Sequence, residues 1–467
     1  MTIHRIKLDL QYEDSKGVLD EYGNGKNPAA DRDETRSIRN IVNAYETVRE
    51  FLKVTFAGDA ILLQRFYGYF TNKVKLVRIE TPTLSKALKI FETINDRGVG
   101  LDAMDLLKNL LFMNATPTDF DRLKQVWKEV TQEIYKAGEK PLRFLRYFII
   151  ANYDVDPKIR EEEIYNWFVR NEKQSKHTAN PLSFAKKLKD AAAAYHQYTL
   201  NNDKTGNFRR GLWNTRALGG SAFKQHFVLL LSGKDLPYKS FDSLCTDVEE
   251  LMFVWLIAGV PAKEYDRLIA AIARDLRKVK TDSEYVAFKS RMIGSEKRNK
   301  SGFQDSLLEM ASWDMRTFRL KYLLAKMTQA IDWEAYGKPG REDLSKYLDV
   351  QNDIEHVLAQ RPSPAATKEF GNGADDEEVI ESLGNLMWIE RSINRVIRNN
   401  SYSEKAKAYP TSQFLWARSQ AAPFMVGAND QISKAAKRLP SYPKWSASFV
   451  QARQEWIAKK ALEVWNL

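Results

Sequence analysis

The chain has 467 residues, 43% of them hydrophobic, and a formal net charge of +11. That length is enough for two or three domains that each bury a core. No stretch approaches the ~20 apolar residues that cross a bilayer, and no apolar signal region follows the first basic residues. The single cysteine, Cys245, excludes an internal disulfide and a cysteine zinc cluster. These features predict a cytoplasmic protein without a membrane segment, whose charge suits an anionic partner.

The first 53 residues predict a strand, a loop and a helix in that order. Apolar and polar residues alternate over residues 3–10, which favours a strand. Residues 20–33 are rich in glycine, asparagine and proline, which favours a loop. Apolar residues recur at three- and four-residue steps over residues 35–53, so we predict a helix there.

A helix–break–helix pattern follows. Residues 85–95 predict a helix, and Gly98 suits the positive φ that ends one. Asp102 can cap a new helix. At this junction Asn95 and Arg97 are candidate contacts to a nucleotide or a DNA phosphate, because arginine forms paired hydrogen bonds with phosphate. The alternative is a plain helix–turn–helix junction in which Asn95 and Gly98 serve backbone geometry alone.

The middle of the chain carries no motif with a chemical interpretation. Residues 117–345 predict amphipathic helices with breaks at 201–206 and 295–302, and their aromatic residues are interpreted as core. Glycine and proline at 336–340 indicate an interdomain boundary. The predicted domains are residues 1–116, 117–345 and 346–467.

The pattern changes after residue 345. Residues 353–358 favour a strand, and an irregular segment over 361–375 and a short helix ending at Gly384 follow. Residues 385–389 again favour a strand, and 394–409 favour a helix. Strand, excursion, strand and helix is the order of a ββα-metal nuclease core. The predicted fold class is therefore mainly α with small α/β elements, ending in a ββα-metal (HNH) domain.

Hydrolysis of a phosphodiester requires an activated water and a cation that stabilises the developing charge. Asp353, Glu355 and His356 lie in the first predicted strand, Asn385 at the second and Asn394 on the helix. Strand alternation separates His356 from both carboxylates. We therefore predict that Asp353, Glu355 and Asn394 hold a divalent cation, Mg²⁺, through oxygen. His356, with an ordinary pKa near about 6.5, is predicted as the general base, with Asn385 beside it.

The surrounding charge fits a phosphate ligand. Residues 391–460 contain 13 Lys or Arg and 3 Asp or Glu, as a binder of the phosphate backbone requires. Lys405, one helix further on, is predicted to contact a phosphate oxygen. Each feature also has an ordinary interpretation. A Glu-His pair is most often a surface pair, Asn394 suits a helix cap, and a basic block can be a solvated surface.

Several short motifs occur in one order over about the last 120 residues. They are Ile354-Glu-His-Val-Leu, Leu383-Gly-Asn-Leu, Ser392-Ile-Asn394, Asn399-Asn-Ser-Tyr-Ser-Glu-Lys405, Tyr409-Pro-Thr-Ser412 and Trp456-Ile-Ala-Lys-Lys-Ala-Leu. This region resembles the C-terminal nuclease domain of the GmrSD family of modification-dependent (type IV) restriction endonucleases. The resemblance implies that His356 is catalytic, with Asn385 and Asn394 in the site. The family usually has proline where Ala359 stands, and we expect weaker rigidity there without loss of activity.

The N-terminal part resembles the same family. Phe91-Glu-Thr-Ile-Asn-Asp-Arg-Gly98, followed by Leu101 and Asp105-Leu-Leu-Lys-Asn109, is similar to the second signature of its N-terminal domain. The resemblance implies a ParB/sulfiredoxin-like core associated with nucleotide binding, hydrolysis and sensing of modified DNA. The family's first signature, Asp-Gly-Gln-Gln-Arg, is absent. We therefore expect either a separate polypeptide encoded upstream or a truncated product, and NTP hydrolysis by this chain alone is not expected.

These observations predict a DNA endonuclease or nickase of bacterial phage defence, directed at modified DNA and dependent on a divalent cation. The residues do not distinguish glucosylated hydroxymethylcytosine from a backbone phosphorothioate, or one oligomeric state from another. One alternative is a non-catalytic DNA-binding or interaction subunit of a split system, which the missing signature and Ala359 favour. A nuclease that acts on RNA or without selectivity is the other, because a ββα-metal site reads the backbone more than the bases.

Overall fold

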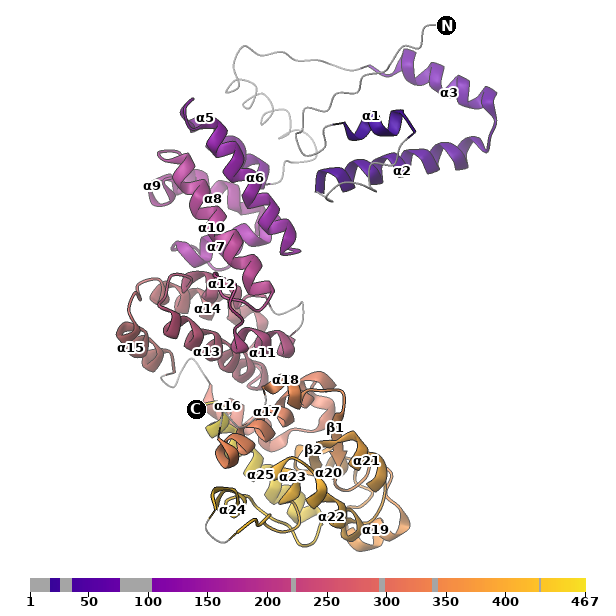
Figure 1. Cartoon of the computed structure of the whole chain (residues 1–467), viewed down its shortest axis with the longest axis vertical. Helices are drawn as coiled ribbons and strands as arrows, with labels where there is room; N and C mark the ends of the chain where they lie inside the picture. Colours follow the sequence, from indigo (N-terminus) through magenta and orange to yellow (C-terminus); the bar gives the residue numbers. More distant parts are fainter. Residues whose placement is uncertain are drawn as a thin grey trace. The chain divides into compact units, whose positions relative to one another are not determined.

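The protein is described from a computed structural model. It covers residues 17–25, 36–75, 103–219, 224–293, 299–337, 343–427 and 430–467. The chain divides into two compact units, residues 1–98 and 99–467. The described part is mainly helical, with a single two-stranded sheet (Figure 1). The strand predicted over 3–10, the helix predicted over 85–95 and the candidates Asn95 and Arg97 lie outside the described residues.

The first unit contains three described helices, α1 (Val18–Gly23), α2 (Arg36–Phe56) and α3 (Ala60–Lys73). Helix α2 confirms the helix predicted over 35–53, and Asp59 begins α3 by accepting hydrogen bonds from the backbone N–H groups of the first turn. The loop predicted over 20–33 is wrong at its start, which is helical to Gly23. Two acidic residues in the first turn favour this short helix, and Tyr22 stacks on Tyr45 of α2 with ring centroids 3.9 Å apart.

The first half of the second unit is built from helices around one hydrophobic cluster, called the first core below. Helix α6 shows why these segments are helical, because its buried side chains recur at three- and four-residue steps and pack on α10. The helices are α5 (Ala103–Asn114), α6 (Phe120–Lys136), α7 (Pro141–Asn152), α8 (Ile164–Arg170), α9 (Glu172–Ser175), α10 (Pro181–Thr199), α11 (Arg210–Gly219), α12 (Phe227–Ser232), α13 (Tyr238–Ile257), α14 (Ala262–Leu276) and α15 (Asp282–Ile293).

The rest of the unit surrounds a second cluster, called the second core below, which contains Trp388, Trp416 and Trp465. Helix α13 belongs to both cores, with Leu244 in the first and Phe253 in the second. The helices of this part are α16 (Lys300–Glu309), α17 (Thr317–Tyr336), α18 (Leu344–Tyr347), α19 (Pro364–Phe370), α20 (Glu377–Glu381), α21 (Arg391–Ile397), α22 (Tyr402–Ala408), α23 (Leu415–Arg418), α24 (Gln431–Ala436) and α25 (Ala447–Val464), with the 3-10 turns η4 (Ser312–Asp314), η6 (Leu383–Asn385) and η7 (Tyr409–Thr411).

The predicted order of strand, excursion, strand and helix is present in the second core. Strand β1 (Asn352–His356) pairs antiparallel with β2 (Leu386–Glu390), so that His356 lies opposite Leu386. Helix α21 follows β2 directly and contacts both strands. Mainly α with small α/β elements is therefore the observed fold class.

Two details of this region differ from the sequence-based expectation. The segment 361–375 contains helix α19, which starts because Ser363 accepts a hydrogen bond from Ala366 N and proline occupies its first turn. The single helix predicted over 394–409 is two helices, α21 and α22. Arg398 separates them with φ of 40°, a conformation that no α-helix contains.

None of the helices that the structure describes combines the length and the apolar character that crossing a bilayer requires. The two units are divided after residue 98, and the domain boundaries expected at residues 116 and 345 stay predictions.

Candidate active site

His356 is the last residue of β1, and it lies against a carboxylate from the excursion between the strands. Its Nε2 is 3.1 Å from Oε2 of Glu381, the last residue of α20. Burial lowers the pKa of His356, while the nearby Glu381 carboxylate opposes that shift. The imidazole is therefore neutral at neutral pH. Because an ionised carboxylate only accepts hydrogen bonds, Nε2 carries the proton and Nδ1 carries the lone pair.

The free ring nitrogen is what makes this arrangement chemically useful. In the described part of the chain, Nδ1 of His356 makes no hydrogen bond, and 17% of the side chain is exposed. A water molecule can therefore reach a neutral nitrogen base whose other nitrogen is held by a carboxylate. This is the arrangement of an oriented general base.

Glu381 is itself held in place. Gln360 Nε2 donates a 2.6 Å hydrogen bond to Oε1, and the Ser312 hydroxyl donates to Oε2. Burial acts to raise the pKa of Glu381, but the hydrogen bonds from Ser312, Gln360 and His356 together lower it below its usual value. The carboxylate is therefore ionised and fixed in orientation. Neither Glu381 as the partner of His356 nor Gln360 and Ser312 as the partners of Glu381 were predicted from the sequence. The one available signal was the group of acidic residues that ends at Glu381.

Asn385 uses its whole side-chain amide inside the protein. Its Oδ1 accepts hydrogen bonds from Leu358 N at 2.8 Å and Trp445 Nε1 at 3.1 Å. Its Nδ2 donates to Leu358 O at 2.8 Å and Ile380 O at 2.7 Å. Leu358 lies just after His356, and Ile380 lies just before Glu381. Asn385 therefore ties together the two segments that carry the His–Glu pair, and its polar atoms are all engaged.

Lys405 and Glu355 form a buried ion pair. Lys405 Nζ is 2.6 Å from Glu355 Oε1 and 2.7 Å from the backbone O of His356, and Tyr409 Oη donates to the same carboxylate at 3.3 Å. Lys405 is 0% exposed. Burial raises the pKa of Glu355 against the effect of the ammonium, and it lowers the pKa of Lys405 against the effect of the carboxylate. The two charges compensate each other, and Lys405 holds the backbone of His356.

Asp353 pairs with basic side chains, and Asn394 contacts the backbone of β1. Asp353 Oδ1 is 2.8 Å from Lys321 Nζ, and Oδ2 is 3.6 Å from Arg391 Nη2. Burial acts to raise the pKa of Asp353, but the hydrogen bond from Lys321 and the neighbouring positive charges lower it. Asn394 Nδ2 donates to Ile354 O at 3.0 Å, which ties α21 to β1. The structure therefore brings Asn394 to β1, while Asp353 and Glu355 form ion pairs with different basic side chains.

The residues present do not form a complete metal-binding set. Within the described ranges, no group of three or more His, Cys, Asp or Glu side chains is arranged to hold a metal ion. Both carboxylates predicted as ligands face lysine or arginine. Mg²⁺ is often bound through one or two carboxylates together with water and substrate phosphates.

Comparison with known proteins places the site in a family domain. The model for "GmrSD restriction endonucleases, C-terminal domain" matches residues 297–460, which contain the His–Glu pair and most of the second core. The model for "GmrSD restriction endonuclease, N-terminal domain" matches residues 3–112. Together the two matches cover more than half of the chain. No curated protein matches it. Restriction endonucleases generally use divalent cations and act on DNA.

Proposed function

Because the chain belongs to the GmrSD family of restriction endonucleases, which act on DNA in defence against phage, we propose that its C-terminal domain is an HNH-type nuclease with His356 as the general base. The observation that carries the proposal is the contact between His356 and Glu381 at the end of β1. It supplies a neutral, oriented imidazole beside the two-stranded sheet. We propose Mg²⁺ as the cation and modified DNA as the substrate.

The chemistry assigned to the chain's own residues is a proton transfer. Nδ1 of His356 takes a proton from a water molecule while the water oxygen forms a bond to phosphorus. The bond between phosphorus and the leaving oxygen then breaks, and the leaving oxygen takes up a proton from the solvent. The imidazolium that forms is stabilised by the Glu381 carboxylate at 3.1 Å. Asn385 and Lys405 act by positioning, because they hold the backbone at Leu358 and at His356.

A plasmid-cleavage assay tests the base. Wild type and His356→Ala are incubated with supercoiled DNA, plain or modified, with Mg²⁺ or with a chelator. We expect His356→Ala to lower the cleavage rate by roughly 10²- to 10⁴-fold. His196→Ala is the matched control, since His196 also pairs with a carboxylate, Glu133, at 2.8 Å and is 16% exposed, but belongs to the first half of the unit. Equal rates for wild type and His356→Ala would remove the proposal.

A second candidate is a non-catalytic DNA-binding subunit of a split restriction system. It is favoured by the ion pairs that engage Asp353 and Glu355. This candidate predicts DNA binding without cleavage under any divalent cation. In that case the cleavage assay is repeated after adding a separate polypeptide that carries the Asp-Gly-Gln-Gln-Arg signature. Cleavage of an RNA substrate in the same assay would identify a nuclease of broad specificity.

A further inference from the structure

A positively charged pocket lies in the first half of the second unit, outside the residues matched by either family domain. It has a volume of about 510 Å³ and is formed by α7, the segment at residues 158–161 and the residues just before α12. Five of its lining residues are cationic and one is a carboxylate, Glu161. The cations are Arg143, Arg146, Lys158, Arg160 and Lys224.

Arg146 gives the pocket a fixed wall. Its Nε donates to Ile159 O at 2.8 Å, and its Nη2 donates to Pro157 O at 2.7 Å. The same guanidinium pairs with Asp266 of α14 at 2.8 Å. These bonds hold the segment that carries Lys158 and Arg160 against the helices. The two side chains therefore start from an ordered backbone, which lowers the entropy lost on binding a ligand.

Three of the five basic side chains of this pocket form weak ion pairs or none. The nearest carboxylates to Arg143 are 3.7 and 3.8 Å away, beyond hydrogen-bond distance. Arg160 pairs with Glu162 at 3.6 Å, and both side chains are mostly exposed, so the pair is weak. Lys158 forms no ion pair within the described ranges. By contrast, Lys224 is neutralised by the buried Glu139 at 2.7 Å.

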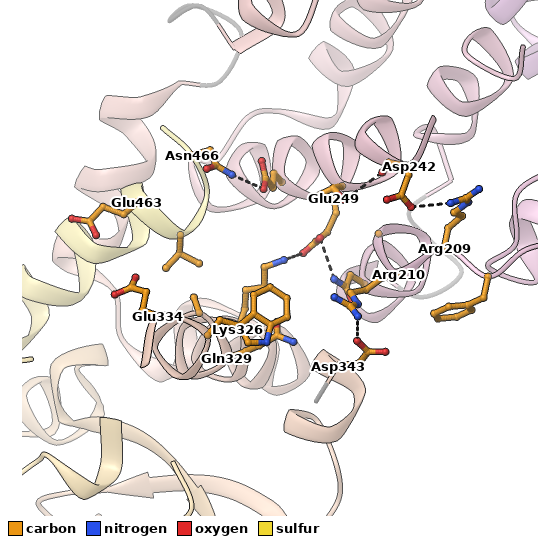
Figure 2. Close-up of a pocket in the computed structure, with 18 of the residues that line it drawn as sticks. Arg209, Arg210, Asp242, Glu249, Lys326, Gln329, Glu334, Asp343, Glu463 and Asn466 are labelled. Carbon is orange, nitrogen blue, oxygen red and sulfur yellow. Dashed lines mark hydrogen bonds and ion pairs between the residues drawn. The ribbon is translucent and has the colours of Figure 1, made fainter. Parts of the chain in front are cut away.

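The charge of this pocket differs from that of a larger one between the two cores. The larger pocket, of about 720 Å³, is shown in Figure 2. Six carboxylates line it, and its three cations are paired with them: Arg209 with Asp242, Arg210 with Asp343 and Lys326 with Glu249 (Figure 2). Its excess of negative charge opposes a phosphate ligand, whereas the excess positive charge at Arg143, Lys158 and Arg160 attracts one.

We propose that Arg143, Lys158 and Arg160 form a second DNA-binding site that contacts the phosphate backbone away from the nuclease core. The choice of DNA as the ligand rests on the proposed function. Arginine guanidinium groups can hold phosphate oxygens in pairs, and the Lys158 ammonium adds a point charge. Such contacts carry no base information, so the site adds affinity for plain and modified duplex alike.

The salt dependence of binding tests this site. Binding of a plain duplex to full-length His356→Ala, which keeps the DNA intact, is measured between about 50 and 200 mM salt. Adding Arg143→Gln, Lys158→Gln and Arg160→Gln should lower the slope of log K against log salt by roughly 2 to 3, about 0.9 for each lost phosphate contact. A control triple, Lys204→Gln, Arg267→Gln and Lys278→Gln, replaces exposed cations elsewhere in the unit and should keep the slope. Thermal unfolding checks that both triples fold.

The outcomes separate this inference from the proposed function. If His356→Ala binds neither plain nor modified duplex, both fail. If it binds and the pocket triple keeps the full slope, this inference alone is overturned. ATP and inorganic phosphate are added as competitors, because free phosphates share the same chemistry. Loss of ATP binding in the triple with unchanged DNA binding would overturn DNA as the ligand.

Discussion

The Lys405 ammonium is hydrogen-bonded to the Glu355 carboxylate at 2.6 Å, and both residues are buried. The same nitrogen reaches the backbone oxygen of His356 at 2.7 Å. The pair therefore joins α22 to β1 at the residue proposed as the base. Because two buried opposite charges compensate each other, removing one costs far more than removing both.

Lys405→Met should lower the free energy of unfolding by about 3–5 kcal/mol, since it leaves the Glu355 carboxylate buried without a counter-ion. The double variant Lys405→Met/Glu355→Gln should recover much of this loss. Urea unfolding measures both. Lys407→Met is the control, because its pair with Glu404 is exposed and should contribute about 1 kcal/mol or less. Equal losses in the single and double variants would contradict a compensating pair.

Glu381→Gln should slow DNA cleavage and move its pH profile. The Glu381 carboxylate raises the pKa of His356 against the lowering effect of burial, so the neutral amide should let that pKa fall further. The rising limb of the rate against pH then moves to lower pH. The plateau should fall by about 10- to 10⁴-fold, because the imidazolium loses its stabilising charge. Glu378→Gln, an exposed change on the same helix, should alter neither feature. A slower rate with an unmoved limb would argue for structural damage.

The lowered pKa of His356 also predicts how stability depends on pH. The folded state releases the His356 proton at a lower pH than the unfolded chain, whose histidine has the ordinary pKa of 6.5. Below about pH 6.5 the unfolded state therefore binds more protons, and wild type should lose stability relative to His356→Gln as pH falls. Above about pH 7.5 the difference should be flat. The slope from one proton is at most about 1.4 kcal/mol per pH unit. Urea unfolding of both proteins between pH 5 and 8 measures the difference, and the opposite slope would mean that the folded state favours the imidazolium.

The order of β1, β2 and α21 was predictable because strand alternation and the residues that end each element are local signals. The partner of His356 was not, because Glu381 lies 25 positions later in the chain and meets it only when the excursion folds back. Lys405 is predicted from the sequence to contact a phosphate oxygen, and lysines are usually exposed. Its burial depends on a carboxylate 50 positions earlier in the chain. The break at Arg398, where φ is 40°, was likewise not predicted from the sequence.

Among the glycines near the site, Gly384 should be the most sensitive to substitution, because helix α25 packs directly against it. A Cβ at Gly384 would lie 2.1 Å from Val450 O and 3.0 Å from Gln454 Cβ. Arg453 and Gln454 of α25 also hydrogen-bond to the Gly384 backbone, both at 2.8 Å. Gly384→Ala must therefore push the helix away or move the turn that carries Asn385.

We expect Gly384→Ala to lower the free energy of unfolding by roughly 1–3 kcal/mol or more. It should also slow cleavage, because Asn385 would no longer hold together the two segments that carry His356 and Glu381. Gly427→Ala is the control, since its new methyl group would meet one atom, at 3.7 Å, and should change stability by less than about 0.5 kcal/mol. If Gly384→Ala matches Gly427→Ala in urea unfolding and in cleavage rate, α25 does not position the site.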